Sequence, residues 1–485
     1  MRLIYHSISV LSTLYAKYTF YKPLYQVAYL KKPKKLSISR HPIITGALIL
    51  TVTGFITRII GFFYRIYLSR LFGEEGMGIY QLISPVLALS FSLCAAGYQT
   101  ALSKLVAEQT KGHGLRPLFA GLSITLPLST VCGIITYHMA DFIAANLLME
   151  PRCTHMLRIL AFSFPPVAVH ACINGYFYGH KRTAVPALSQ LLEQLSRVGC
   201  VYLLSAGALR RGESPSVNNA VYGLLLGEVV SMTISLIALQ FFCADAGSSH
   251  SGFLRPFARS GIRGQKSTYA GLLATALPLT ANRMILNFLQ SVESVSIPAR
   301  LRLYGYDTAT SLSVYGVLTG MAVPLIYFPN AITGSVAVLL LPTISENYAA
   351  GNLKAVYKST LLTVKYCFLM GFSCMVVFLV SGKWVGANLF NSPLAGHFIR
   401  NLSFICPFIY LDTTLSSILQ GLGMAGQIFA MNVVCLVLRL CFVFLAVPRV
   451  GITGYLWGIL AGQLLQCFLY FFCLARFLKR TSFVR

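Results

Sequence analysis

Two arginines inside an apolar stretch are the first residues that could do chemistry. Arg58 and Arg65 lie within residues 43–68 on a stripe of small and polar residues that also contains Thr51, Gly54 and Gly61. The spacings of three and four residues put this stripe on one face of a helix. Guanidinium groups match phosphate oxygens in a bidentate geometry. The stripe therefore predicts a cationic wall for an anionic ligand; the alternative is that Arg65 only extends its side chain to a membrane interface.

A second polar stripe occupies residues 268–297. It consists of Arg283, Asn287, Gln290 and Ser294, at spacings of four, three and four, with Glu293 alongside. Pro278 precedes it and is expected to kink the helix. Neutral amides beside an arginine suit sugar hydroxyls and phosphate together. The alternative is a hydrogen-bond network between helices that never touches a ligand.

Further ionisable residues lie in the remaining apolar stretches. Glu193 and Arg197 are four residues apart and predict an ion pair on one helix. Glu228 could bind Na⁺ or a proton, or pair with an arginine. Arg439, seven residues after an asparagine, repeats the polar-stripe pattern, whereas Asp412 is expected to be interfacial. The predicted ligand-binding set is Arg58, Arg65, Arg283, Asn287, Gln290 and Arg439, and the predicted ion-coupling or structural set is Glu193, Arg197, Glu228 and Glu293.

Nothing in the sequence predicts catalysis, a cofactor or a metal. No G-x-x-x-x-G-K-[ST] loop occurs, and the 13 cysteines show no metal-ligand spacing. The net charge of +26 could indicate nucleic acid, but Lys and Arg gather between apolar stretches, as the positive-inside rule predicts. We therefore expect a protein that is not an enzyme and does not bind nucleic acid.

The composition is that of an integral membrane protein. Hydrophobic residues make up 56% of the chain and charged residues 11%, against about 25% charged in soluble domains. A spanning helix needs about 20 apolar residues. Such stretches predict an all-α polytopic protein with about 12 spans, near 43–68, 79–105, 117–139, 157–178, 185–206, 219–243, 268–297, 311–341, 357–381, 397–420, 427–447 and 451–475.

A polar linker at 244–266 divides these spans into two groups of six. The predicted parts are a basic aromatic segment at 1–41, lobes at 42–243 and 267–478, and a tail at 479–485. The first segment is either an interfacial helix or the product of a misassigned translation start. Basic residues concentrate in the loops on the side of both termini, which places the termini in the cytoplasm.

The two halves resemble each other in sequence. Tyr80-Gln-Leu-Ile-Ser corresponds to Tyr315-Gly-Val-Leu-Thr, Gly179 to Gly421 and Arg197 to Arg439, at offsets of 235 to 242 residues. Because six spans is an even number, both repeats enter the membrane from the same side. This parallel arrangement predicts two pseudo-symmetric six-helix bundles around a central cleft, as in alternating-access transporters.

Several ordered motifs resemble the stage V sporulation protein B family of flippases, within the multidrug/oligosaccharidyl-lipid/polysaccharide (MOP) superfamily. They are Thr57-Arg-Ile-Ile-Gly-Phe-Phe-Tyr-Arg, Ser291-Val-Glu-Ser-Val-Ser-Ile-Pro-Ala-Arg and Leu340-Leu-Pro-Thr-Ile-Ser-Glu346. The resemblance covers about 42–478. It implies a MATE-like fold in the bacterial cytoplasmic membrane and outward movement of a polyprenyl-pyrophosphate-linked saccharide.

The resemblance leaves the saccharide open. Related lipid II flippases place the two first-helix arginines six apart and follow the second with Asp, whereas Ile66 follows Arg65 here. They also carry two more C-terminal helices. The expected partners are the lipid-linked saccharide, membrane lipid and a coupling Na⁺ or H⁺. The alternatives are a multidrug cation antiporter of the same superfamily and a membrane scaffold of cell-wall assembly.

Overall fold

The computed structural model describes residues 42–108, 115–245 and 262–482. The segment 1–41, most of the 244–266 linker and the last three residues of the tail lie outside these ranges. The chain divides into Met1–Thr45 and Gly46–Arg485. Of the first unit only residues 42–45, in the opening turn of a helix, are described. The second unit contains the rest of the described chain.

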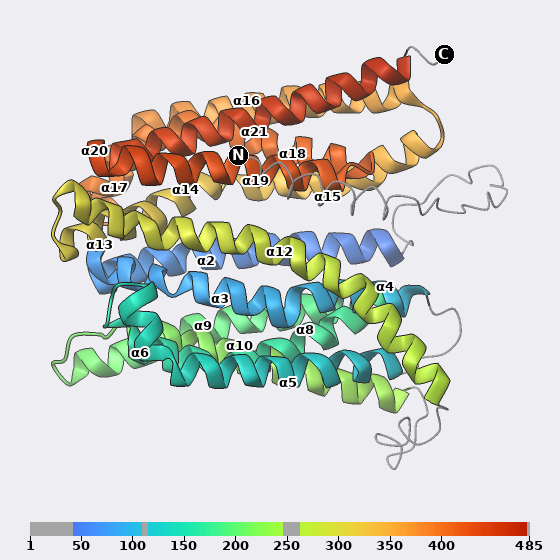
Figure 1. Cartoon of the computed structure of the whole chain (residues 1–485), viewed down its shortest axis with the longest axis horizontal. Helices are drawn as coiled ribbons and strands as arrows, with labels where there is room; N and C mark the ends of the chain where they lie inside the picture. Colours follow the sequence, from blue (N-terminus) through green and yellow to red (C-terminus); the bar gives the residue numbers. More distant parts are fainter. Residues whose placement is uncertain (1–41, 109–114, 246–261, 483–485) are drawn as a thin grey trace, which may run out of the picture. The chain divides into compact units, whose positions relative to one another are not determined.

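Every regular element in the described ranges is a helix, which confirms the all-α prediction. Helices satisfy their backbone groups internally, as a lipid environment requires. The first half contains α2 (Pro42–Leu82), α3 (Ser84–Phe91), η2 (Ser92–Ala96), α4 (Gly97–Glu108), α5 (Arg116–His138), α6 (Ala140–Phe142), η3 (Ile143–Leu147), α7 (Cys153–Ala161), α8 (Phe164–Gly179), α9 (Ala184–Arg210) and α10 (Asn218–Asp245) (Figure 1).

The second half repeats this pattern of long helices with short interruptions. It contains α12 (Ile262–Tyr304), α13 (Thr308–Gly316), η4 (Val317–Ala322), α14 (Val323–Tyr327), α15 (Asn330–Ala349), α16 (Leu353–Asn388), α17 (Pro393–Leu402), η5 (Ser403–Ile405), α18 (Cys406–Gly421), α19 (Ala425–Cys441), η6 (Phe442–Ala446), α20 (Val447–Val450) and α21 (Ile452–Ser482).

The helices are long and apolar enough for a multi-pass membrane protein. Nine stretches of the described chain qualify as spans, or ten if α7 and α8, bent by 44°, count as one. One stretch, Ile49–Glu108, has 60 residues, and at about 1.5 Å per residue it is far longer than the bilayer is thick. It breaks at Gly73, whose φ of 69° and ψ of −169° suit glycine alone. Dividing it there and adding the more polar α9 gives the predicted number of about 12 spans.

The buried apolar core joins the two halves at one end. Its largest cluster includes Leu68 and Met77 of α2 together with Tyr315, Leu318 and Tyr410 of the second half. Two smaller clusters have no member in common. One lies among α4, α5, α8, α10 and the first part of α12, and the other among α15, α16, α18, α19 and α21. The halves therefore pack against each other near Gly73 and have separate cores toward the opposite loops.

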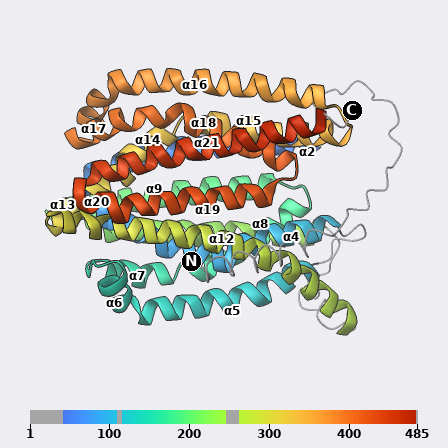
Figure 2. The same cartoon turned by 45° about the horizontal axis from the view of Figure 1, so that its top comes forward.

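Helix α12 contacts both halves. Leu272 and Ala276, near its start, belong to the core of the first half, and α12 also contacts α3 and α5. Near its end, Ile297 and Leu301 join the shared core, where α12 contacts α13, α19 and α20. Figures 1 and 2 show it running between the two groups of helices. The sequence placed this helix in the second lobe only.

Candidate functional site

A cavity of about 370 Å³ lies between the two halves of the chain. One wall is the predicted arginine stripe of α2, with Arg58 and Arg65 on the same helical face. The other wall comes from α14 and α15. The complete lining is Arg58, Gly61, Phe62, Arg65, Pro324, Tyr327, Phe328 and Asn330. The structure thus brings both α2 arginines into one cavity at the position of the predicted cleft.

Both arginines of this cavity are free to bind an anion. Within the described residues, neither Arg58 nor Arg65 has an ion-pair or hydrogen-bond partner. Arg58 reaches across to α15, because a Cβ placed on Gly334 would lie 3.4 Å from its Nη1. The rings of Phe62 and Phe328 meet beside them with centroids 4.7 Å apart. Two unpaired cations between aromatic walls form a site that favours a compact polyanion.

The polar stripe of α12 contains one residue that is hydrogen-bonded to the first half and two that have no partner in the described chain. Asn287 donates hydrogen bonds to Ser92 Oγ and to the carbonyl oxygen of Ala88, at 3.4 Å for the second, so it ties α12 to the first half. Arg283 and Gln290 are exposed, and no described residue pairs with them. None of the three lines the cavity between α2 and α15. Their contact with a ligand stays a prediction.

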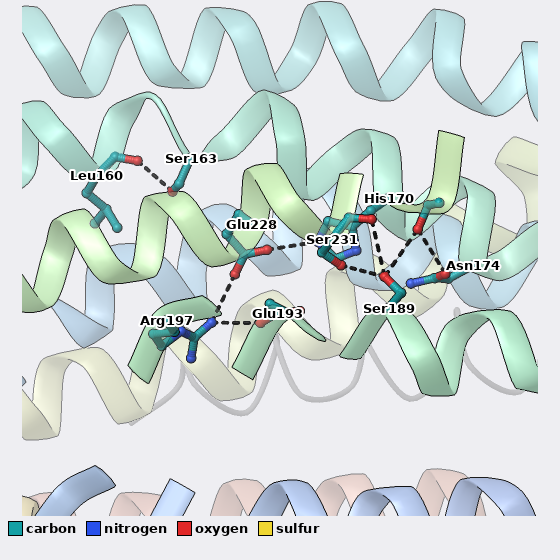
Figure 3. A network of polar contacts seen from close by, with 10 residues as sticks. Leu160, Ser163, His170, Asn174, Ser189, Glu193, Arg197, Glu228 and Ser231 are labelled. Carbon is teal, nitrogen blue, oxygen red and sulfur yellow. Dashed lines mark hydrogen bonds and ion pairs between the residues drawn. The ribbon is translucent and has the colours of Figure 1, made fainter. Parts of the chain in front are cut away.

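In the first half, four ionisable side chains meet in one buried network (Figure 3). The Arg197 guanidinium contacts a carboxylate oxygen of Glu193 at 2.7 Å and one of Glu228 at 3.4 Å. The second oxygen of Glu228 lies 2.9 Å from Nε2 of His170. The structure therefore contains the predicted Glu193–Arg197 pair, and of the alternatives for Glu228 it shows a pairing with arginine.

Small polar side chains extend this network toward α8. Ser189 Oγ lies 2.7 Å from Ser231 Oγ and 3.2 Å from Ser235 Oγ, and Ser235 donates to Asn174 Oδ1 at 3.5 Å. His170 and Asn174 are one helical turn apart on α8. Neither residue was predicted from the sequence, although a histidine such as His170 within an apolar span is itself a signal of interior placement.

The second half contains an ion pair that links three helices. Arg439 of α19 contacts Oε1 of Glu293 on α12 at 2.6 Å, and the Tyr455 hydroxyl of α21 donates to the same oxygen at 2.9 Å. The Glu293 side chain is only 3% exposed. Arg439 is thus neutralised and does not line the cavity, so its predicted role in ligand binding has no contact in its favour.

The second half contains a polar cluster at the position that the sequence repeat aligns with His170. The offset of 242 that aligns Gly179 with Gly421 also aligns His170 with Asp412. Asp412 Oδ1 and Gln463 Nε2 are buried and have no hydrogen-bond partner among the described residues. Asp412 as a whole is half-buried, and its location at the membrane interface stays a prediction. Beside it, Asn432, Gln466 and Tyr470 form hydrogen bonds of 2.6 to 3.3 Å.

Ion pairs also hold the loops at the end where the halves join. Arg152 contacts Glu75 at 2.8 Å and Glu150 at 2.6 Å. Burial raises the pKa of Glu150, but the hydrogen bonds and charge of Arg152 outweigh burial and hold it below its ordinary value. Asp307 caps α13 by accepting from the backbone N–H groups of Ala309 and Thr310. A hydrogen bond with the Thr310 side chain, together with these backbone bonds, lowers the pKa of Asp307.

A polytopic helical protein with two related halves around a cationic cavity has the architecture of the MOP transporters. Solved structures share this fold, and two of them illustrate it. A multidrug resistance MATE family transporter in an inward-facing conformation matches with a TM-score of 0.67 and 18% identity, over 90% of this chain and 99% of that one. The lipid II flippase MurJ, in an inward closed conformation, matches with a TM-score of 0.68 and 13% identity, over 88% and 87%.

The chain belongs to the polysaccharide biosynthesis protein family, whose model matches residues 43–348. Stage V sporulation protein B of Bacillus subtilis is 28% identical over 439 residues, which cover 89% of this chain and 83% of that protein. The lipid II flippase MurJ of the same organism is 22% identical, over 79% of this chain and 73% of its own length. The predicted family and membrane fold are confirmed.

Proposed function

We propose that this protein is a flippase that moves a polyprenyl-pyrophosphate-linked oligosaccharide across the cytoplasmic membrane by alternating access. The observation that carries the proposal is the cavity between the halves, where Arg58 and Arg65 are unpaired. A pyrophosphate offers several oxygens in the geometry that guanidinium groups bind best. Membership of a polysaccharide biosynthesis family and a relative named as a lipid II flippase support the same class of ligand.

The packing of the two halves suits a transporter closed on one side. The two halves share a buried core near Gly73. Toward the opposite end, each half has its own separate core. With the termini in the cytoplasm, as the loop charges predict, the joined end faces outward. The pyrophosphate would then reach Arg58 and Arg65 from the cytoplasmic side, while the polyprenyl chain stays in lipid.

The alternative functions fit the cavity less well. A cation antiporter needs carboxylates in its cavity, and the lining identified in the described residues contains two arginines and no carboxylate. A scaffold has no use for unpaired charges in a cleft, because an ionisable group at membrane depth is costly without a partner or water. Glu193 and Glu228 of the first half are instead paired with Arg197, and Glu293 is paired with Arg439.

The test is flipping of a fluorescent undecaprenyl-pyrophosphate oligosaccharide in proteoliposomes. Arg58→Ala and Arg65→Ala should each reduce the rate at least about tenfold, since each removes a charge-assisted contact. Arg210→Ala is the matched control, because Arg210 is an exposed arginine at the end of α9, outside the cavity. Undiminished flipping in the Arg58→Ala, Arg65→Ala double variant would contradict the assignment of the cavity.

A further inference from the structure

The network around Arg197 has one feature that ion pairing alone does not explain. It contains two carboxylates, Glu193 and Glu228, and one guanidinium, so its fixed charges leave one negative charge over. The fourth member, His170, balances that charge only when its imidazole carries a second proton. Uncompensated charge away from water is costly. The site therefore has a place for one additional positive charge.

The geometry puts that charge between two particular atoms. His170 Nε2 and Glu228 Oε2 are 2.9 Å apart, a distance that one shared proton spans. His170 is 9% and Glu228 8% exposed, so neither is solvated like a surface group. Nδ1 of His170 is buried without a hydrogen-bond partner among the described residues. The imidazole therefore points its paired nitrogen into the network (Figure 3).

We propose that the network of His170, Glu193, Arg197 and Glu228 binds and releases a single proton, held between His170 and Glu228. As a coupling site this rests on the proposed function, whereas the binding of the proton itself does not. Protonation changes the network from one net negative charge to none. The network joins α8, α9 and α10, so its charge state acts on the packing of three helices at once.

A metal ion is the competing occupant, and the position of Arg197 disfavours it. Three possible ligand atoms, one from each side chain, lie within 4.8 Å of one another, close enough to coordinate one metal ion. They belong to His170, Glu193 and Glu228. However, the Arg197 guanidinium already contacts both carboxylates, at 2.7 and 3.4 Å. A bound cation would have to lie beside this fixed positive charge or displace it. A proton needs no such displacement.

The other ionisable groups around the network come from α2. The charged and titratable side chains that face Arg197 are the two glutamates and, from α2, Tyr64 and Tyr80. Those that face Glu193 are Glu228, Arg197 and His170.

Helix α2 also connects the network to the cavity. A Cβ on Gly61, which lines the cavity, would lie 3.5 Å from Gln194 Nε2, next to Glu193 in sequence. A change of charge at the network can thus reach the helix that carries Arg58 and Arg65.

The direct test follows the histidine signals of the purified, isotope-labelled full chain by NMR as the pH is changed. The chain has nine histidines. His170→Gln should remove one signal that titrates between about pH 5 and 9, and Glu228→Gln should move the midpoint of that signal. His155→Gln, which changes an exposed histidine on α7, should remove a different signal and leave this one unchanged.

Two results would overturn the proposal. One is a His170 signal that does not titrate in this range. The other is a His170 signal that shifts on addition of Na⁺ or Zn²⁺ at constant pH, which would assign the site to a metal. The NMR titration needs no substrate, so a wild-type protein that fails to flip lipid can still show it. Failure of the proposed function is therefore distinguishable from failure of the proton site.

A second measurement tests coupling. In proteoliposomes with an imposed pH gradient, flipping by the wild type should respond to the gradient. The response should disappear in His170→Gln and be retained in the control variant His155→Gln. An unchanged response in His170→Gln would separate the proton site from transport and overturn the coupling role.

Discussion

Gly78 of α2 and Gly316 at the end of α13 meet backbone to backbone where the two halves join. A Cβ placed on Gly316 would lie 2.8 Å from the Gly78 Cα, closer than real Cβ atoms approach. Tyr315 and Leu318, on either side of Gly316, are buried in the shared core. Since neither backbone can move without disturbing that core, this contact needs glycine on both sides.

Gly316→Ala is therefore expected to loosen the joined end. The added methyl group would push α13 away from α2, and overpacking of this kind costs about 1–3 kcal/mol. Hydrogen–deuterium exchange should become faster in residues 74–82 and 308–316. Gly199→Ala is the matched control, because nothing lies within 4 Å of a Cβ at Gly199. Equal exchange in both variants would show that the contact does not hold the halves together.

Arg70 makes a second contact between the halves, and the contribution of this contact can be measured separately. It donates to the carbonyl oxygens of Leu389, at 2.8 Å, and Asn388, at 2.5 Å, at the C-terminal end of α16. A cation at a helix C-terminus contributes about 0.3–1 kcal/mol when exposed. Arg70→Ala should therefore speed hydrogen exchange in the last turn of α16 with little change in overall stability. Protection as strong as in the wild type would mean that the contact contributes nothing in solution.

The arginine stripe of α2 could be predicted because one helix determines it. Spacings of three and four residues fix which side chains share a face, and the structure keeps Arg58, Gly61 and Arg65 in one lining. The helical fold and the number of spans followed for a similar reason, since lipid imposes length and apolarity on each segment separately. These features depend on local sequence.

Partners on different helices could not be predicted in this way. His170 is a lone histidine in an apolar span, and only the packing of α8 against α10 brings it to Glu228. Arg439 looked like Arg58 in the sequence, but its partner Glu293 is 146 residues away on α12. The surroundings of Asp412 depend in the same way on the neighbouring helices, because one of its carboxylate oxygens is buried. Long-range packing decides such cases.

The Glu293–Arg439 pair should behave as a buried ion pair. Arg439→Met would leave the Glu293 carboxylate, 3% exposed, without its cation and should destabilise the protein by about 3–5 kcal/mol. The double variant Glu293→Gln, Arg439→Met removes both charges and should recover most of this loss. Thermal unfolding in detergent can be followed with a thiol-reactive dye through the 13 free cysteines. A single variant as stable as the double would show that the pair is not desolvated.

Exchanging the charges of Glu193 and Arg197 tests whether they form an isolated pair. An isolated pair would tolerate Glu193→Arg with Arg197→Glu. In the structure Arg197 also contacts Glu228 at 3.4 Å, so the exchange would place a carboxylate beside a carboxylate. The exchanged variant should therefore have lower thermal stability and reduced flipping. Full activity at wild-type stability would favour the purely structural pair and the scaffold alternative.

Stability at acid pH should depend on Glu150. Its pKa is held below the ordinary value of 4.5, because the hydrogen bonds and charge of Arg152 outweigh burial. A carboxyl whose pKa is lower in the folded state stabilises the protein above its unfolded pKa, and that contribution is lost as the pH falls through the folded value. The unfolding temperature should thus drop below about pH 4.5, and the drop should be smaller in Glu150→Gln. Glu213→Gln, in an exposed pair with Arg211, is the control and should follow the wild type. If Glu150→Gln and Glu213→Gln show the same acid profile, the ion pair with Arg152 does not contribute to folding, and the loop at the joined end is held by its backbone contacts alone.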